Sequence, residues 1–276
     1  MKKLKLPKVI GTVLLGMLSL LFLSPLIWML SAAAKVEKDV MKYPVEWIPK
    51  EWNLINNFKT VWLENVSFDT YYWNSIKIAV ITTLLTLIIS SMAAYSFAKL
   101  EYPLKNGLFI VLLGFFLIPT ESTLVPRFIL MNWLGLYDTH ESLILMLAFS
   151  IPITFLMRQY MTGISTEYIE SAKVDGAGHF RIYWQIILPM VKPILATGGI
   201  LKFIWTWNDY QNPLIFLSSD NLYTIPLGIQ AFMSEYGTSY ATTMMAAVSA
   251  ILPLMIVFLI LQRHVIEGIQ VGGVKG

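Results

Sequence analysis

Long apolar runs without charge alternate with short charged segments along the whole chain. An α-helix needs roughly 20 apolar residues to cross about 30 Å of hydrocarbon. Stretches of about that length predict six spans, if a terminal charged or amide side chain is placed at the interface. These spans are expected at about 9–32, 76–98, 106–128, 141–160, 191–217 and 240–262. The pattern therefore predicts an all-α integral membrane protein that forms a single transmembrane domain over residues 1–276.

Composition agrees with a membrane protein. Hydrophobic residues make up 56% of the chain and charged residues 13%, whereas a soluble domain of this length needs far more charge to cover its surface. The sequence contains no cysteine, which excludes disulfides, thiolate metal sites and cysteine nucleophiles. Its net charge is +3, but the basic residues are spread over loops and form no basic groove with interleaved aromatic residues. A nucleic-acid partner is therefore not expected.

The distribution of basic residues predicts the orientation. Cytoplasmic flanks of membrane helices are enriched in Lys and Arg, so the lysines before the first span place the N-terminus in the cytoplasm. They are Lys2, Lys3, Lys5 and Lys8. Six crossings then return the C-terminus to the cytoplasm. A cleaved signal peptide is the alternative for the first span, but its apolar run exceeds the usual core of about 7–15 residues, so we expect a retained helix.

An external segment at 35–74 lies between the first two spans. It contains Trp47, Trp52, Trp62 and Trp73 among mixed charges. Tryptophan at this density is typical of a segment that lies at the headgroup boundary. Two interpretations remain open, an interfacial connector and a surface for an external partner.

A polar segment at 163–190 follows the fourth span, and the orientation above places it in the cytoplasm. Its first part predicts a short helix. Thr166 is suited to cap the first turn, Glu170 lies where the helix dipole favours negative charge, and Gly176 is suited to a left-handed stop. Alone, this pattern is also typical of an ordinary cytoplasmic loop with an amphipathic helix.

A second helix is predicted after Gly176. Leu188-Pro189 is expected to end it, and Pro193 to begin the next span. Side chains at helical spacing form an apolar stripe that is expected to lie against the membrane-embedded body. The stripe consists of Phe180, Tyr183, Trp184 and Ile187. The two helices would form an elbow that can transmit a push from outside the membrane.

The spacing of Glu170-Ser171-Ala172, Gly176 and Ile186-x-Leu188-Pro189 resembles the EAA motif of ABC-importer permeases, EAA-x3-G-x9-I-x-LP. The one departure is Ser171 in place of the middle Ala, a small-for-small change. Further segments are similar to the carbohydrate-uptake, maltose-permease-like branch of that family. They are Asp175-Gly176-Ala177, Trp207-Asn208-Asp209-Tyr210, Ile225-Pro226-Leu227-Gly228 and Gly273-Val274-Lys275-Gly276. The resemblance covers nearly the whole chain.

The resemblance implies the fold of a type I ABC-importer permease, with six transmembrane helices and both termini in the cytoplasm. It implies a permease subunit that imports a sugar or sugar-like solute (oligosaccharide, monosaccharide, polyol or glycerol phosphate) by alternating access. The coupling residues that would dock on a separate ATPase correspond to Glu170, Ser171, Ala172, Asp175, Gly176, Ala177, Leu188 and Pro189. In the maltose-type branch the C-terminal tail also contacts the ATPases, a role that would fall to Val274, Lys275 and Gly276. A frayed chain end is the alternative for that tail.

The same resemblance implies the other components of the transporter. They are a second homologous permease subunit, two ATPase subunits that bind ATP-Mg, and an extracellular or periplasmic solute-binding protein facing the segment at 218–240. The chain would lie in the cytoplasmic (inner) membrane of a bacterium or archaeon as a multi-pass protein in contact with lipid.

No enzymatic or metal-binding motif accompanies these features. The sequence lacks the phosphate loop G-x4-G-K-[ST], so the chain is not expected to be an ATP-hydrolysing enzyme or to bind a cofactor itself. Its three histidines lack metal-ligand spacing, so no metal site is expected. The alternative function is a stand-alone secondary transporter or channel. It would need paired intramembrane ion-binding groups or inverted repeats, for which Lys202 and Asp209 are the available candidates.

Lys202 and Asp209 are the charged residues inside the fifth predicted span. They are seven positions apart and are therefore expected on one helical face, about 10 Å apart along the axis. A charge at mid-bilayer costs about 2.5–3.5 kcal/mol, so these groups either face a cavity or partner helix or extend toward opposite membrane surfaces. Polar groups here suit a polyhydroxylated substrate, and the candidate translocation path is Lys202, Asn208, Asp209 and Tyr210. In maltose-type importers, however, the partner permease holds most substrate contacts.

Overall fold

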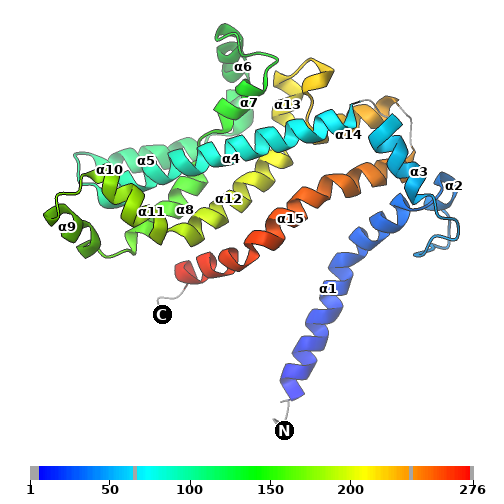
Figure 1. The fold of residues 1–276 in the computed structure, drawn as a ribbon, viewed down its shortest axis with the longest axis horizontal. Helices are drawn as coiled ribbons and strands as arrows, with labels where there is room; N and C mark the ends of the chain where they lie inside the picture. The colour runs from blue at the N-terminus through cyan, green and yellow to red at the C-terminus, as the bar shows by residue number, and fades with distance from the viewer. Residues whose placement is uncertain (1–5, 65–66, 236–238, 274–276) are drawn as a thin grey trace. The chain divides into compact units, whose positions relative to one another are not determined.

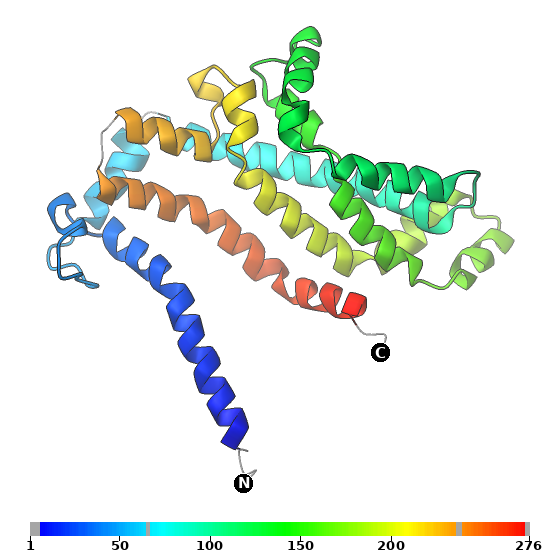
Figure 2. The ribbon, with the colours of Figure 1, turned by 180° about the vertical axis from the view of Figure 1, so that it is seen from behind.

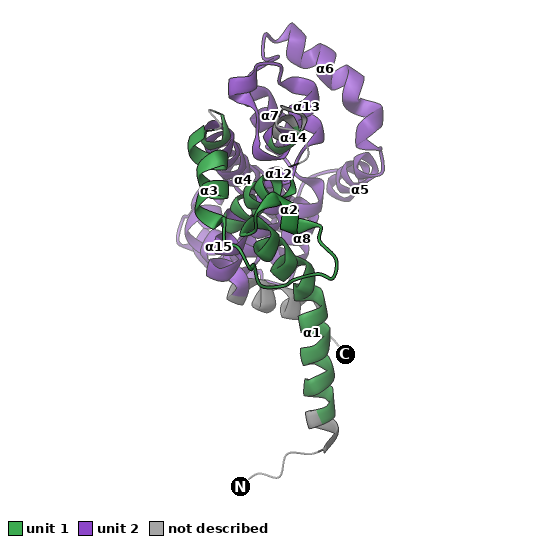
Figure 3. Ribbon diagram, turned by 90° about the vertical axis from the view of Figure 1, so that its right-hand side faces the viewer, with its two compact units in different colours: residues 1–69, 229–252 green, residues 70–228, 253–276 purple. Residues whose placement is uncertain are grey.

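The computed structural model describes residues 6–64, 67–235 and 239–273, and the regular elements among these residues are helices, without a β-strand (Figure 1). The all-α architecture predicted from the sequence is therefore confirmed for the described part of the chain. Contacts between residues divide the protein into two compact units (Figure 3). Unit 1 contains residues 1–69 and 229–252, and unit 2 contains residues 70–228 and 253–276.

Four described helical segments are long and apolar enough to cross a membrane, at 10–33, 68–99, 140–162 and 240–262. Two further candidates are pairs of helices with a sharp bend between them. Residues 105–116 and 120–133 meet at 94°, and residues 179–190 and 192–207 meet at 80°. The described residues therefore offer four spans, or up to six if each bent pair crosses the membrane as one.

Unit 1 begins with a long apolar helix whose end is fixed by a short helix beyond it. The unit contains α1 (Leu6–Ala33), α2 (Glu37–Val40), α3 (Leu54–Lys59) and the π-helix η1 (Thr60–Glu64). Asn57 of α3 donates its side-chain amide to the carbonyl oxygens of Ala33 and Lys35, each at 2.8 Å. Lys35 is itself buried, and its ammonium group donates to the carbonyl oxygen of Glu46. These bonds satisfy backbone groups that the end of α1 leaves without helical partners.

Glu37 joins α2 to the start of α15 (Tyr240–Gly273). Its carboxylate accepts from the backbone N–H groups of Tyr240 and Ala241 at 2.9 and 2.8 Å, and from the hydroxyl of Ser239 at 3.1 Å. The first amides of a helix have no intrahelical acceptor, and a carboxylate there also meets the positive end of the helix dipole. Glu37 therefore caps α15 from a distant part of the sequence.

The tryptophans of the segment at 35–74 fall into two classes. Trp62 donates its indole N–H to the hydroxyl of Ser249 at 3.1 Å and packs edge-on against Phe68. Trp47, Trp52 and Trp73 each expose more than half of their surface. Exposed aromatic rings fit an interfacial connector and a partner surface equally, so both interpretations of this segment stay predictions.

Unit 2 is built on α4 (Phe68–Lys99), the long cyan helix of Figures 1 and 2. It packs with α8 (Ile151–Thr162) and α12 (Lys192–Trp207). Gly198 lets α12 approach α8 closely, because a Cβ atom there would lie 3.1 Å from Cε of Met157. Small residues at such crossings are typical of membrane helices.

Shorter helices complete unit 2. They are α5 (Lys105–Phe116), η2 (Thr120–Thr123), α6 (Leu124–Trp133), α7 (His140–Leu147), α9 (Glu167–Val174), α10 (His179–Ile182), η3 (Tyr183–Ile187), α11 (Leu188–Met190), α13 (Gln211–Phe216) and η4 (Asp220–Leu222). The helix α14 (Ile225–Glu235) begins in unit 2 and ends in unit 1. Figures 1 and 2 show α9, α10 and α11 together at the C-terminal end of α4.

Two predicted spans differ from single straight helices. At 106–128, α5 ends at Phe116 and Pro119 takes an extended conformation with ψ 135° before η2. Proline disfavours a helical conformation at the preceding residue, which explains the break there. At 191–217, α12 ends at Trp207 and a new helix begins at Gln211.

Candidate functional site

The helix α9 and the turn after it form the elbow predicted from the sequence. Gly176 has φ +80°, the left-handed conformation expected for it. The N–H of Gly176 bonds to the carbonyl oxygen of Lys173 at 3.0 Å, and the N–H of Ala177 bonds to that of Ala172 at 2.9 Å. This pair of bonds is a Schellman motif, which satisfies the last carbonyl groups of a helix and favours glycine at the left-handed position.

The start of α9 differs from the prediction. The side chain of Thr166 makes no capping bond, and its backbone is already helical. The hydroxyl of Ser165 instead accepts from the N–H of Glu167 at 3.3 Å. The predicted cap was therefore wrong by one residue. Ser and Thr are both good caps, and their adjacency in the sequence leaves the register undetermined.

α9 has one face against the protein and one face open. Ile169 and Ala172 are buried, whereas Glu170, Ser171 and Asp175 are exposed. The small side chain of Ala172 therefore permits close packing within this chain. The exposed residues form a polar surface that carries negative charge.

A shallow hollow adjoins this exposed face. Its volume is about 510 Å³, and it lies between α9 and the π-helical turn that follows α10. Its lining residues are Glu167, Tyr168, Ser171, Ala172, Asp175 and Ile186. The hollow offers carboxylates and hydroxyls beside an apolar floor, which suits a protein side chain with a basic end.

The second helix of the elbow continues past the predicted stop at Leu188-Pro189. α10 runs directly into the π-helix η3, and α11 begins at Leu188. Pro189 lies inside this helical run, because Ile187 and Leu188 before it both have helical backbone angles. The sharp turn comes at Val191, which has φ −97° and ψ 11° and precedes α12. Pro193 lies in the first turn of α12, as predicted.

The predicted aromatic stripe divides into two pairs. Tyr183 and Ile187 are buried, and the hydroxyl of Tyr183 lies 2.8 Å from that of Ser91 on α4. Phe180 and Trp184 are 69% and 54% exposed and stack on each other. The π-helical turn pairs each residue with one five positions away, so the spacing of an α-helix no longer keeps these side chains on one face. The prediction of a buried stripe is therefore correct for Tyr183 and Ile187 and wrong for Phe180 and Trp184.

A single buried core joins the elbow to three long helices. α9 contributes Ile169 and Ala172, and η3 contributes Tyr183 and Ile187. The helices α4, α8 and α12 contribute Ala94, Tyr95, Ile153, Met157, Met161 and Ile194. The elbow therefore packs into the same core as the ends of these helices.

The candidate translocation residues lie in the second half of α12 and just beyond its end. Lys202 is buried within α12, where 6% of its surface is exposed. Asp209 lies beyond the end of that helix, and its carboxylate accepts from the backbone N–H and the side-chain amide of Asn212 at 3.1 and 2.6 Å. Asn208 donates to the carbonyl oxygen of Ile204 at 2.9 Å. Asp209 therefore does not lie on the same helix as Lys202, as the span at 191–217 predicted, but its carboxylate is close enough to act on the charge of Lys202.

Asn208, Asp209 and Tyr210 instead form the connection between α12 and α13. Two hydrogen bonds already occupy the carboxylate of Asp209, while Asn208 is exposed. Among the described residues, no group of three or more His, Asp or Glu side chains could hold a metal ion. The tail residues Val274, Lys275 and Gly276 lie outside the described part of the chain.

The segment at 218–224 is fixed by side chains from distant elements, which the sequence did not indicate. Asp138 accepts from the N–H groups of Ser218 and Ser219 at 2.8 and 2.9 Å, and from the hydroxyl of Ser219 at 2.5 Å. The hydroxyl of Ser219 and then these N–H groups hold the pKa of Asp138 below its ordinary value. Stabilised carboxylates of this kind stay ionised and keep their bonds at neutral pH.

Two further contacts fix the same segment. Asn74 donates its side-chain amide to the carbonyl oxygens of Asn221 and Tyr223 at 2.9 and 3.0 Å. His140 lies between Lys77 and the carbonyl oxygen of Leu222, with Nε2 2.9 Å from that oxygen. The segment that the sequence assigned to an external partner is therefore ordered by its own chain.

The whole sequence is similar to a known family and to transport proteins within it. Residues 4–271 match the family described as Binding-protein-dependent transport system inner membrane component. The chain is 32% identical over 266 residues to the arabinooligosaccharides transport system permease protein AraQ of Bacillus subtilis, an alignment that covers 96% of this chain and 95% of that protein. It is 31% identical over 271 residues to the lactose transport system permease protein LacG of Rhizobium radiobacter, covering 98% and 97%.

A third relative has the same degree of similarity. The melibiose/raffinose/stachyose import permease protein MelC of Bacillus subtilis is 31% identical over 255 residues, which is 91% of each chain. A solved structure shares the fold. It is the crystal structure of a bacterial ABC transporter involved in the import of the acidic polysaccharide alginate, with a TM-score of 0.81, coverage of 93% of this chain and 95% of that chain, and 24% identity. The expected likeness to an ABC-importer permease is confirmed at the level of the fold.

Proposed function

Because this chain belongs to the family of binding-protein-dependent transport system inner membrane components, we propose that it is the permease subunit of an ATP-driven sugar importer. It is a multi-pass inner membrane protein. The observation that carries the sugar assignment is full-length similarity to permeases named for arabinooligosaccharides, lactose and melibiose. Family membership does not favour a stand-alone secondary transporter or channel.

We assign ATPase coupling to α9 and the turn at Gly176. The exposed face of α9 offers Glu170, Ser171 and Asp175 to a partner, and the hollow beside it is large enough for a side chain. Carboxylates form their strongest hydrogen bonds with Arg and Lys. The ATPase cleft is therefore expected to present basic side chains to this face.

The common core supports the way in which a push on α9 would reach the spans. Ile169 and Ala172 pack with residues of α4, α8 and α12, so displacement of α9 would move the ends of these helices together. In the proposed cycle, ATP-driven closure of the two ATPase subunits moves α9 and changes the permease from inward-open to outward-open. ATP-Mg is bound by the ATPase subunits, and this chain holds no cofactor.

The remaining parts of the proposal concern topology and partners. The chain would cross the membrane six times with both termini in the cytoplasm, each bent helix pair counting as one span. It would pair with a second homologous permease, and the ordered segment at 218–224 would face a solute-binding protein. Val274, Lys275 and Gly276 are proposed to extend the ATPase contact.

Substitutions in the elbow test the coupling assignment in the complete reconstituted complex. Gly176→Pro should abolish ATP-dependent uptake, because proline cannot adopt φ +80°. Glu170→Lys should do the same by reversing a charge on the exposed face. Gly178→Ala is the matched control, since Gly178 has φ −73° and open space around it. Both tested variants should insert normally but show the uptake of a complex without ATP; normal uptake by either would disprove the assignment.

The identity of the transported solute is tested in a separate experiment. The solute-binding protein that co-purifies with the complex in mild detergent should bind arabinose oligomers, lactose or a raffinose-type sugar in a calorimetric titration. The purified chain alone, given an ion gradient in liposomes, should not take up the same sugar. Ion-driven uptake without ATPase subunits would instead establish the stand-alone alternative.

A further inference from the structure

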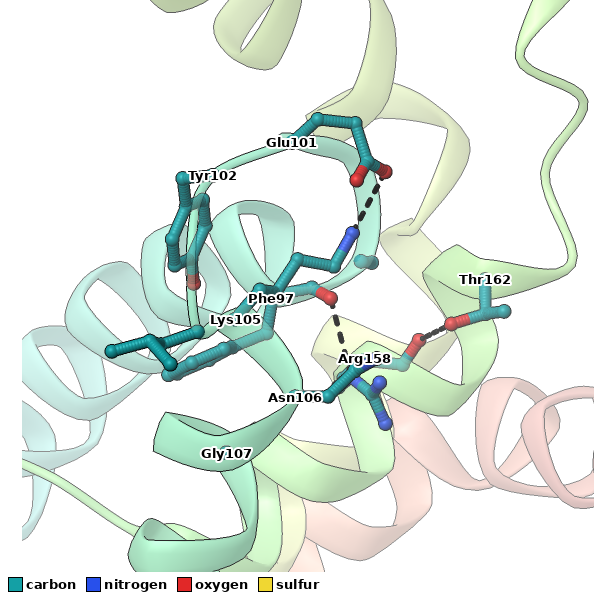
Figure 4. A pocket seen from close by; sticks show the side chains of 10 residues that line it. Phe97, Glu101, Tyr102, Lys105, Asn106, Gly107, Arg158 and Thr162 are labelled. Carbon is teal, nitrogen blue, oxygen red and sulfur yellow. Dashed lines mark hydrogen bonds and ion pairs between the residues drawn. The ribbon is translucent and has the colours of Figure 1, made fainter.

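A second hollow in unit 2 is independent of the coupling surface (Figure 4). Its volume is about 490 Å³. It lies where α4 ends at Lys99, α5 begins at Lys105 and α8 ends at Thr162. Helix ends of membrane proteins lie at the level of the lipid headgroups. The hollow therefore opens at one membrane surface, on the side of unit 2 that also carries α9.

The guanidinium group of Arg158 is held on one side and open on the other. Its Nε donates to the carbonyl oxygen of Phe97 at 3.3 Å, and its central carbon lies 3.9 Å from the centre of the Phe109 ring. Its two terminal nitrogens have no hydrogen-bond acceptor among the described residues (Figure 4). A guanidinium fixed in this way presents a preformed pair of donors to a phosphate or carboxylate.

Arg127 is held by more protein partners than Arg158 in the same chain. Its Nε donates to the carbonyl oxygen of Thr123, its Nη1 to the side chain of Asn212 and its Nη2 to the carbonyl oxygen of Thr120. Each of its nitrogens has a protein partner. The open donors of Arg158 are therefore not a general property of arginine in this protein.

Other lining residues complete a weakly basic, polar site. Lys105 donates to the carbonyl oxygen of Leu100 at 2.8 Å and to the carboxylate of Glu101 at 3.0 Å. An ammonium group has three N–H donors, so one remains for a ligand. The charges of Lys105, Arg158 and Glu101 leave the lining with a net positive charge. Asn106 and Tyr102 add groups that can bond hydroxyls.

An exposed apolar track leads away from the hollow along α5. Leu104 lines the hollow and is 79% exposed. Leu108, Val111 and Phe115 follow at helical spacing and are 50%, 57% and 59% exposed. Residues at this spacing lie on one face of a helix, so the track is continuous with the hollow. A basic hollow above an apolar track matches a phosphate headgroup above an acyl chain.

We propose that this hollow binds the headgroup of an anionic phospholipid such as phosphatidylglycerol. Arg158 and Lys105 bond the phosphate oxygens, while Asn106 and Tyr102 bond the headgroup hydroxyls. The acyl chain lies along α5. Basic pockets between membrane helices bind anionic headgroups by this chemistry. The lipid would lie in the leaflet that faces α9, because Lys99 beside the hollow donates to the carbonyl oxygen of Ile164, just before α9.

Native mass spectrometry of the complete transporter tests the proposal. The complex is released from nanodiscs that contain phosphatidylglycerol and phosphatidylcholine in equal amounts, and retained lipids are counted. Wild type should retain phosphatidylglycerol selectively. Arg158→Gln should retain it about fivefold less, as expected for the loss of one basic residue at an anionic membrane surface. Arg127→Gln is the matched control and should retain it as wild type does.

A second variant keeps the test decisive if Arg158→Gln does not fold. Asn106→Asp places a carboxylate in the first turn of α5, where the helix dipole favours it, yet should repel the phosphate and reduce retention. Equal retention of phosphatidylglycerol by wild type and Asn106→Asp would overturn the proposal. So would equal retention of both lipids by wild type. Displacement of the lipid by soluble glycerol phosphate at millimolar concentration would identify a site for free phosphate and would also overturn it.

Discussion

A methyl group added at Gly228 would collide with an aromatic ring that is itself tied down. The added Cβ atom would lie 2.1 Å from Cδ2 of Tyr71, whose hydroxyl donates to Asp220 at 2.5 Å. We expect Gly228→Ala to destabilise the protein by about 1–3 kcal/mol, the usual cost of overpacking. Gly114→Ala should be neutral or stabilising, because nothing lies within 4 Å of its added Cβ atom and Ala favours a helix. The melting temperatures of the two variants in detergent test this prediction. Equal melting temperatures would contradict the predicted collision.

The carboxylate of Asp138 predicts a pH dependence. Its pKa is held below the ordinary value by Ser219 and Ser218, so its contribution to stability is present above the unfolded pKa of about 3.9. That contribution is lost as the pH falls through the lower pKa of the folded state. Asp138→Asn should therefore melt below wild type at pH 7, and the difference should narrow below about pH 4. A difference independent of pH would show that the carboxylate charge is not responsible.

The conformation and contacts of a single residue could be predicted where its chemistry leaves few options. They could not be predicted where residues distant in the sequence determine them. The left-handed conformation of Gly176 follows from a helix that must stop before a second helix begins. The bond from Ser219 to Asp138 joins residues 81 positions apart, and no local pattern marks it. Lys202 was recognised as unusual from its charge alone, but the end of α12 between it and Asp209 depends on the hydrogen bonds of Asn208 and Asp209.

At the scale of elements, the contribution of the Glu37 cap on α15 to the stability of the protein can be measured. Glu37→Ala removes the acceptor for the N–H groups of Tyr240 and Ala241. We expect a loss of about 0.5–2 kcal/mol, the range for helix caps, and faster hydrogen exchange at those two amides. Glu51→Ala is the control, because Glu51 forms an exposed ion pair with Lys38, and such pairs contribute little. Equal exchange in the two variants would show that Glu37 does not cap α15.

The apolar pattern predicted where the helices lie better than it predicted the π-helical turn within one of them. The second helix of the elbow was expected to end at Leu188-Pro189, because proline usually interrupts a helix. The helix instead continues through the π-helical turn η3 and past Pro189 to Met190, one residue beyond the predicted end. The same turn moves Phe180 and Trp184 off the buried face. π-helical turns have no reliable sequence signal, so neither difference could be foreseen.

At the scale of the whole molecule, the orientation in the membrane is open to direct measurement. The chain has no native cysteine, so single cysteines give an unambiguous reading. Lys38→Cys and Ser165→Cys both place a thiol at an exposed site. In intact cells an impermeant maleimide should label Lys38→Cys and should label Ser165→Cys only after lysis. Labelling of both without lysis would contradict a cytoplasmic elbow.

Apolar length predicted where the chain can cross a membrane, but not how straight each crossing is. The stretches near 106–128 and 191–217 are apolar enough, yet the first is interrupted by a bend of 94° before residue 120, and the second begins at a bend of 80° before residue 192. The apolar length of a segment depends on composition, whereas a bend depends on where backbone groups find partners. Pro119 and Val191 mark those points only once the flanking helices are placed.

The core shared by α9 and three long helices predicts a fixed distance between two exposed positions of the protein. Val174 on α9 is 89% exposed, and Gln159 on α8 is exposed as well. Both helices contribute to one buried cluster, so spin labels at these two positions should keep a fixed separation through a transport cycle. Distances from either label to a partner subunit would then report the motion of the whole piece.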